Sequence, residues 1–153
     1  MTRATLIRIA AGGSLALLAG AFAFQYLGGM APCKLCLWQR WPHAAAVVIG
    51  GLALAFPGRV WPLAGALAAL TTAAIGLYHA GVEQHWWQGP TTCTSGSVSG
   101  LSAQDLLDQI MAAPLVRCDD IPWDLFGVSM AGWNALVSLG LALVWLMAAR
   151  RAV

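Results

Sequence analysis

Four long apolar runs alternate with polar connections along the chain. A transmembrane helix needs about 20 predominantly apolar residues, so each run is long enough to cross a bilayer. Short turn-forming stretches separate the first three runs, and a long polar stretch precedes the fourth. The pattern predicts one all-α membrane domain over residues 1–153, a polytopic four-helix bundle. The expected helices cover residues 9–27, 37–56, 62–82 and 128–149, and the expected outer loops cover 28–36 and 83–127.

The long polar stretch contains one further helical pattern. Ser102 followed by Asp105 is typical of a helix N-cap, and apolar residues then cluster on one face. The segment from Leu101 to Val116 is too short and too acidic to span a membrane. It predicts a short amphipathic helix that lies along the membrane surface or against the bundle. The run Thr91–Gly100 before it is rich in turn formers and is expected to be irregular and mobile.

Composition supports a membrane protein. Hydrophobic residues make up 59% of the 153 residues, and charged residues make up only 9%. A soluble protein of this size would not have enough charged side chains to cover its surface. The chain also lacks a glycine-rich nucleotide-binding fingerprint, and no nucleic-acid partner is expected.

The charged residues are divided between the two ends of the predicted bundle. Because cytoplasmic loops of membrane proteins carry an excess of Lys and Arg, both termini and the short loop at Arg59 are expected in the cytoplasm. The loops at 28–36 and 83–127 then face outward. Five arginines lie on the cytoplasmic side (Arg3, Arg8, Arg59, Arg150, Arg151), and all six acidic residues lie between the end of the third run and the fourth (Glu83, Asp105, Asp108, Asp119, Asp120, Asp124).

A cleaved signal peptide is the alternative interpretation of the first run. The start of the chain is basic, and Ala21-Phe22-Ala23 resembles a small-residue cleavage site. The apolar stretch continues to Leu27, which is longer than a usual signal core. Cleavage would leave the cysteines on the same side of the membrane.

All four cysteines lie in the outward-facing connections, at Cys33, Cys36, Cys93 and Cys118. Cysteines used for packing would also occur within the apolar helices, so their confinement to one side is a signal. The compartment outside a bacterial inner membrane is oxidising, and disulfides persist there. Four cysteines allow three full pairings, which the sequence alone does not distinguish.

Cys33 and Cys36 form a Cys-x-x-Cys motif at the expected start of the second helix. The positive end of the helix dipole favours a thiolate at such a position. If the helix is regular, Cys36 shares one face with Arg40 and His43. A cation one turn from a thiol lowers the thiol pKa and can hold an electron-rich acceptor. The alternatives are that Arg40 extends toward lipid head groups and that His43 is an ordinary helix residue.

Two tryptophans flank this motif. Trp38 and Trp41 fall where an interfacial aromatic belt is expected. The sharper hypothesis is a stacking wall for a flat ring, which would make Trp38 a cofactor-binding residue.

Cys93 and Cys118 are 25 positions apart and flank the predicted amphipathic helix. The spacing suits a disulfide that closes a flexible loop. It does not suit zinc, whose four-cysteine sites usually consist of two Cys-x-x-Cys hooks, so no metal site is expected. Two purely structural disulfides are an alternative, although a ring across two intervening residues closes too short a loop to gain much chain entropy.

Thiol–disulfide exchange only moves oxidising equivalents from one cysteine pair to another. A chain that oxidises dithiols must therefore hand the electrons to a final acceptor. The sequence contains no flavin attachment motif, and Leu37 rather than a histidine follows Cys36, so the haem motif Cys-x-x-Cys-His is absent. A lipid-soluble quinone beside Cys36 and Arg40 is the natural candidate.

These motifs together resemble one known family. The segment Pro32–Arg40 is similar to the Cys-x-x-Cys…Arg signature of the DsbB disulfide bond formation proteins of bacterial inner membranes. Tyr78–Glu83, Gly89-Pro90 before Cys93, and Gly127–Asn134 after Cys118 are also similar to that family. A lone Cys-x-x-Cys is a weak signal, but the resemblance covers nearly the whole chain in order.

The resemblance implies a thiol:quinone oxidoreductase with a defined electron path. It implies that Cys93–Cys118 oxidises a periplasmic thioredoxin-fold partner of the DsbA type, with Cys93 forming the mixed disulfide. Cys118 would then pair transiently with Cys33, and Cys36 would be released as a thiolate that faces a membrane quinone held with the help of Arg40. Ubiquinone is the expected acceptor, with menaquinone as the alternative. The multi-pass chain would lie in the inner membrane, in contact with lipid.

Two further residues and two further functions complete the expectations. His79 and Glu83 lie one turn apart at the outer end of the third helix, where they either bond locally or relay a proton to the reduced quinone. One alternative function is a haem- or copper-binding membrane protein that uses His43, His79 and the cysteines. The other is a non-catalytic membrane scaffold whose disulfides brace the long loop.

Overall fold

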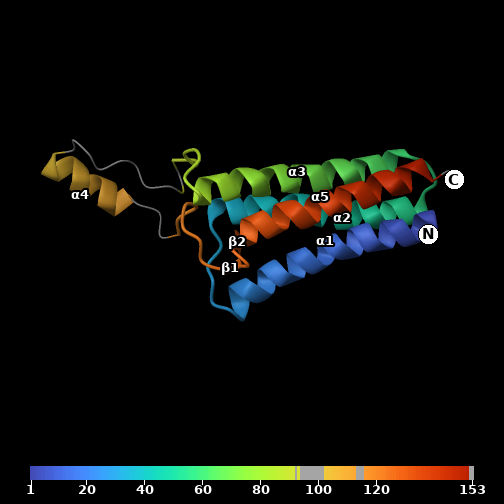
Figure 1. The fold of residues 1–153 in the computed structure, drawn as a ribbon, viewed down its shortest axis with the longest axis horizontal. Helices are drawn as coiled ribbons and strands as arrows, with labels where there is room; N and C mark the ends of the chain where they lie inside the picture. Colours follow the sequence, from blue (N-terminus) through green and yellow to red (C-terminus); the bar gives the residue numbers. More distant parts are fainter. Residues whose placement is uncertain (92, 94–101, 113–115, 152–153) are drawn as a thin grey trace.

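The four apolar runs form four long helices that pack lengthwise. The computed structural model describes residues 1–91, 93, 102–112 and 116–151. Helix α1 packs against α2 and α5, and α3 packs against the same two helices, so α1 and α3 lie diagonally across the bundle (Figure 1). This confirms the predicted all-α four-helix bundle. The helices are α1 (Arg3–Tyr26), α2 (Lys34–Ala55), α3 (Val60–Glu83) and α5 (Met130–Arg150).

The bundle belongs in a membrane. Helices α1, α3 and α5 are each long and apolar enough to cross a bilayer. Helix α2 has 22 residues and packs between α1 and α3. By composition it is less suited to span than the other three, since its outer turns carry Lys34, Gln39 and Arg40. Both chain ends lie at one end of the bundle, opposite the hairpin and α4 (Figure 1).

Local capping sets where the helices begin. The side chains of Thr2 and Ser129 accept hydrogen bonds from the backbone N–H groups of the first turns of α1 and α5. Helix α1 therefore begins at Arg3, ahead of the expected residue 9. Helix α2 begins at Lys34, because Cys33 acts as its N-cap, and it continues through Pro42. Pro42 lies inside this helix without ending it, although a proline removes one helical hydrogen bond.

Small residues let the helices approach closely. A side chain at Gly50 of α2 would meet Ala11 of α1, and a Cβ at Gly65 of α3 would lie 2.6 Å from ring atoms of Trp145. Trp145 of α5 is fully buried at the centre of the apolar core. The half of the bundle near the chain termini is therefore held together by contacts of glycines with alanine and tryptophan side chains. The other half contains the cysteines.

The long connection between α3 and α5 contains two short elements. Helix α4 (Ala103–Ala112) confirms the predicted loop helix over a shorter range, and it lies beyond the bundle rather than against it (Figure 1). Strands β1 (Asp124–Leu125) and β2 (Val128–Ser129) form an antiparallel hairpin that leads directly into α5. The expected irregular segment Thr91–Gly100 lies almost entirely outside the described residues.

The hairpin was not predicted. Its turn places Phe126 and Gly127 at φ 54° and 75°, and the glycine suits this left-handed backbone. Because Val128 and Ser129 belong to the hairpin, α5 begins at Met130 rather than at residue 128. The hairpin ends at Ser129, the N-cap of α5, and so fixes the first turns of the helix that carries Asn134.

Candidate active site

The four cysteines come together at the end of the bundle away from the chain termini. Cys93 and Cys118 form a disulfide, whereas Cys33 and Cys36 are free thiols with their Sγ atoms 2.8 Å apart. Cys33, Cys93 and Cys118 are buried in one small apolar cluster with Leu35. The loop cysteines are thus packed against the helix motif.

Within the Cys-x-x-Cys motif the two thiols have different roles as hydrogen-bond partners. The Cys33 thiol donates to Cys36 Sγ, and Cys33 Sγ accepts the Cys36 backbone N–H at 3.2 Å. The hydrogen bond to Cys36 is the main cause, and burial the second, of a Cys33 thiol pKa far above its usual range. Cys33 therefore keeps its proton, and negative charge on the pair belongs on Cys36.

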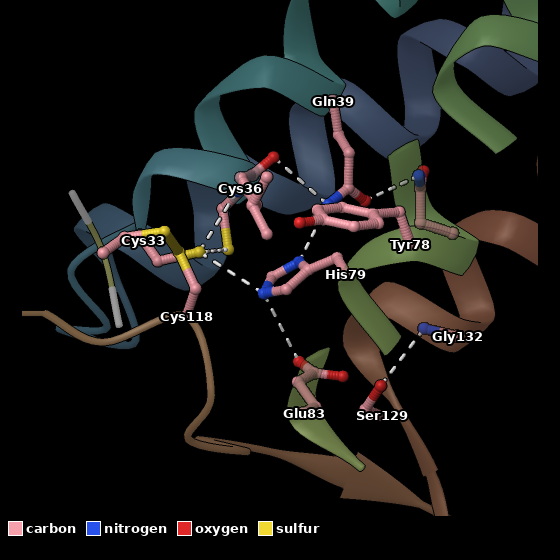
Figure 2. Close-up of polar contacts among 12 residues, drawn as sticks. Cys33, Cys36, Gln39, Tyr78, His79, Glu83, Cys118, Ser129 and Gly132 are labelled. Carbon is pink, nitrogen blue, oxygen red and sulfur yellow. Dashed lines mark hydrogen bonds and ion pairs between the residues drawn. A yellow bond between two sulfur atoms is a disulfide. The ribbon is translucent and has the colours of Figure 1, made fainter. Parts of the chain in front are cut away.

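His79 lies between the sulfurs and Glu83 (Figure 2). Its Nε2 is 3.5 Å from Cys33 Sγ and 3.7 Å from Glu83 Oε1. The same ring is within 4.8 Å of Cys118 Sγ. Both His79 and Glu83 are buried, and neither caps α3. The structure therefore brings these two sequence-derived candidates to the sulfur centre.

A cavity of about 500 Å³ lies beside the sulfur centre. Its walls come from α1, α2, the outer end of α3, the hairpin region and α5, and its lining is mainly apolar. Its volume is within the usual range of small-molecule sites. Five of the candidate cofactor-binding residues line it: Cys36, Arg40, His43, His79 and Glu83.

Arg40 is turned inward, toward α1. Its Nη1 donates to Gln25 Oε1 at 2.6 Å, and its Nη2 donates to the Ala21 carbonyl at 3.2 Å. The guanidinium also lies 4.8 Å over the ring of Phe22. These contacts fix the side chain beside the cavity rather than among lipid head groups. Its Nε is buried and has no hydrogen-bond partner among the described residues.

Trp38 is the candidate that the structure places elsewhere. Its ring is 46% exposed on the outer face of α2, beneath the Lys34 ammonium, and it is not among the described residues that line the cavity. The aromatic walls come instead from Phe24, Trp123 and Trp133. Trp133 is held there because its indole N–H donates to the Leu125 carbonyl of the hairpin.

A buried polar network connects His43 with His79. Its amide residues had no predicted role. Gln39 Nε2 lies 3.0 Å from His79 Nδ1, and Asn134 Nδ2 lies 2.7 Å from Gln39 Oε1. Asn134 Oδ1 lies 2.8 Å from His43 Nε2. The available signal was one uncharged amide within α2 and one within α5, since polar groups in membrane helices are costly and usually functional.

Cys33, His79 and Cys118 also lie close enough to one another to be compared with a metal site. Cys33 Sγ, Cys118 Sγ and a ring nitrogen of His79 all lie within 4.8 Å of one another. Cys118 is disulfide-bonded, however, so its sulfur is not a thiolate ligand. The cluster is better suited to exchange between sulfurs than to coordination.

Comparisons with known proteins agree with this chemistry. Residues 3–148 match the family described as Disulfide bond formation protein DsbB. A "Disulfide bond formation protein B 2" of Pseudomonas savastanoi pv. phaseolicola is 35% identical, over 81% of this chain and 75% of its own length. A "Disulfide bond formation protein B" of Albidiferax ferrireducens is 29% identical, over 90% of this chain and 85% of its own. No solved structure matches the chain. With four cysteines gathered at one end of a membrane bundle and a match over nearly its whole length, the chain belongs to the DsbB family of disulfide bond formation proteins, which are membrane oxidoreductases.

Proposed function

We propose that this protein is a thiol:quinone oxidoreductase that reoxidises a periplasmic DsbA-like dithiol protein and passes the electrons to a membrane quinone. One observation carries the proposal. Cys33 Sγ lies 2.8 Å from Cys36 Sγ and within 4.8 Å of Cys118 Sγ, and Cys36 lines the cavity. Cys33 thus stands between the loop disulfide and the sulfur that meets the acceptor.

The electrons enter at the loop disulfide. A partner thiolate attacks Cys93 Sγ, breaks the Cys93–Cys118 bond and forms a mixed disulfide, with Cys118 leaving as the thiolate. The second partner thiol then displaces Cys93 and closes the partner's own disulfide. Cys93 is only 1% exposed, so the loop segment must move aside for the partner to reach it.

The electrons then move to the Cys-x-x-Cys pair. When Cys33 and Cys36 are joined as a disulfide, the Cys118 thiolate attacks Cys33 and releases Cys36. Cys93 resolves the Cys33–Cys118 bond, which restores the loop disulfide and leaves two thiols at Cys33 and Cys36. Those thiols close to a disulfide again, and their two electrons and two protons reduce the quinone to quinol.

The cavity fits a quinone ring. Its lining is mainly apolar, and the buried Nε–H of Arg40 is a donor without a partner among the described residues. A quinone carbonyl oxygen, which only accepts hydrogen bonds, would satisfy that donor. Arg40 would therefore hold the ring beside Cys36, with His43 in the cavity wall and His79 and Glu83 nearer the sulfurs. Ubiquinone and menaquinone both have the required carbonyl oxygens and a lipid-soluble tail.

The proposal is tested with detergent-solubilised protein, a reduced thioredoxin-fold dithiol and a soluble ubiquinone. We expect quinone reduction that Cys36→Ser abolishes, since Cys36 would be the thiolate that passes the electrons to the quinone. Cys93→Ala should also block reduction by the protein dithiol while leaving quinone binding intact. An unchanged rate for Cys36→Ser would refute the electron path.

A further inference from the structure

The amide of Asn134 is oriented in one way only. Its Nδ2 lies 2.7 Å from Gln39 Oε1 and 3.3 Å from the Thr72 carbonyl oxygen. Thr72 Oγ1 lies 3.1 Å from Asn134 Nδ2. It donates its own hydrogen to the backbone carbonyl of Gln39 and therefore accepts from Asn134. With three acceptors around Nδ2, the opposite atom Oδ1 must face His43.

This orientation fixes the tautomer of His43. Its Nε2 lies 2.8 Å from Asn134 Oδ1, so Nε2 carries the hydrogen of the neutral ring and Nδ1 carries a lone pair. His43 is only 3% exposed and lines the cavity. Its Nδ1 has no partner among the described residues, and a buried acceptor without a partner costs free energy. Nδ1 is therefore the ring nitrogen left without a partner, on a side chain that lines the cavity.

His79 accepts a hydrogen bond from the amide of Gln39, whereas His43 donates one to the amide of Asn134. The Gln39 Nε2 donates to the Leu35 carbonyl at 3.2 Å, which sets the amide, and to His79 Nδ1 at 3.0 Å. The hydrogen of His79 is then on Nε2, which faces Cys33 Sγ. The two amides thus direct the N–H of His79 toward the sulfur centre and leave an unpartnered lone pair on His43, whose ring lines the cavity.

The N–H of His79 suits the sulfur exchange, and the lone pair of His43 suits the reduction of the quinone. Sulfur exchange develops negative charge on a leaving thiolate, which an N–H stabilises. A quinone carbonyl cannot bond to a lone pair, but a quinol hydroxyl can. We propose that His43, positioned by Asn134, accepts a hydrogen bond from the quinol hydroxyl and makes the cavity prefer the reduced over the oxidised ring. Asn134 is a positioning residue, and the inference rests on the proposed reduction of a quinone.

The test measures binding of each redox form separately. Decylubiquinone and decylubiquinol are titrated anaerobically against the full chain in detergent, in a Cys36→Ser background that prevents electron exchange. His43→Phe keeps a ring without nitrogen, and Asn134→Leu removes the acceptor of His43. We expect each to raise the Kd of the quinol about tenfold, the effect of one lost hydrogen bond, and to leave the Kd of the quinone within about twofold.

Ser138→Ala is the matched control. Ser138 is fully buried and its hydroxyl lies 3.5 Å from the same Asn134 Oδ1, but the His43 bond remains without it. This variant should change neither Kd. Equal effects of His43→Phe on both forms, or no effect, would overturn the inference while quinone reduction still stands. A chain that binds neither form would overturn the proposed function as well.

The tautomer of His43 can also be measured directly, in the unmodified protein. The chain has three histidines, so histidine-selective ¹⁵N NMR of the unmodified protein resolves them. We expect His43 as the neutral Nε2–H form, and Asn134→Leu should give a mixture of tautomers. An Nδ1–H ring in the unmodified protein contradicts the proposal.

Discussion

At the scale of single residues, Arg40 has every polar atom but one committed to α1. Arg40→Lys keeps the charge, but an ammonium group cannot reach Gln25 and Ala21 together while also presenting an N–H to the cavity. We therefore expect the KM for a soluble quinone to rise about tenfold, with the KM for the reduced protein partner unchanged. Steady-state kinetics with each substrate varied in turn measure the two constants.

Lys34→Gln is the control for this substitution. It removes the other cation near the motif, on the exposed face of α2, and should leave the quinone KM unchanged. If the two variants raise the quinone KM equally, net charge near the motif matters and the fixed geometry of Arg40 does not.

Residue positions on α2 show what periodicity can predict. Cys36, Arg40 and His43 share one face because they are four and three residues apart, and all three line the cavity. Trp38 is two residues from Cys36, a rotation of about 200°, so helical geometry itself places it on the opposite face. The orientation of the Gln39 and Asn134 amides was beyond periodicity, because it depends on partners from α3 and α5.

At the scale of elements, the close contact between α3 and α5 depends on a glycine, Gly65, which has no side chain. A Cβ at Gly65 would lie 2.6 Å from the Trp145 ring, and Trp145 is fully buried and has no free space to move into. Gly65→Ala should therefore lower the free energy of unfolding by about 1–3 kcal/mol, the usual cost of overpacking. Thermal unfolding in detergent measures the loss.

Gly51→Ala on α2 is the matched control, because nothing lies within 4 Å of its added Cβ. Alanine is the better helix former, so this variant should keep or raise the Tm. Equal losses for both glycines would mean that the contact with Trp145 does not limit the approach of the helices.

The elements also differ in how far sequence could predict them. The long helices follow from apolar runs whose length matches the bilayer. The β1–β2 hairpin did not, because its turn has Phe126 at positive φ, where Asn, Asp or Gly is the usual signal. The burial of Cys93 and Cys118 was not predicted, because it comes from a contact between distant segments, which loop composition does not indicate.

At the scale of the whole molecule, the arginines near the chain termini lie at the opposite end of the fold from the sulfur centre. Arg3, Arg59 and Arg150 lie near the chain termini, whereas the sulfur centre and every acidic residue lie toward the other end. The Arg3 guanidinium donates to the Gly58 carbonyl, so the N-terminus and the α2–α3 connection are held together there. The positive-inside rule then predicts that this end is cytoplasmic and that the sulfur centre is periplasmic.

Reporter fusions in a bacterial host test this orientation. Green fluorescent protein after Val153 should fluoresce, and alkaline phosphatase at the same point should be inactive. Alkaline phosphatase inserted within residues 94–101 should be active, because these residues follow Cys93 of the sulfur centre in the sequence. Disulfide exchange with a periplasmic partner requires this arrangement, since the partner dithiol cannot cross the membrane. An active phosphatase after Val153 would reverse the orientation and separate the sulfur centre from an oxidising compartment, so the proposed function would fail with it.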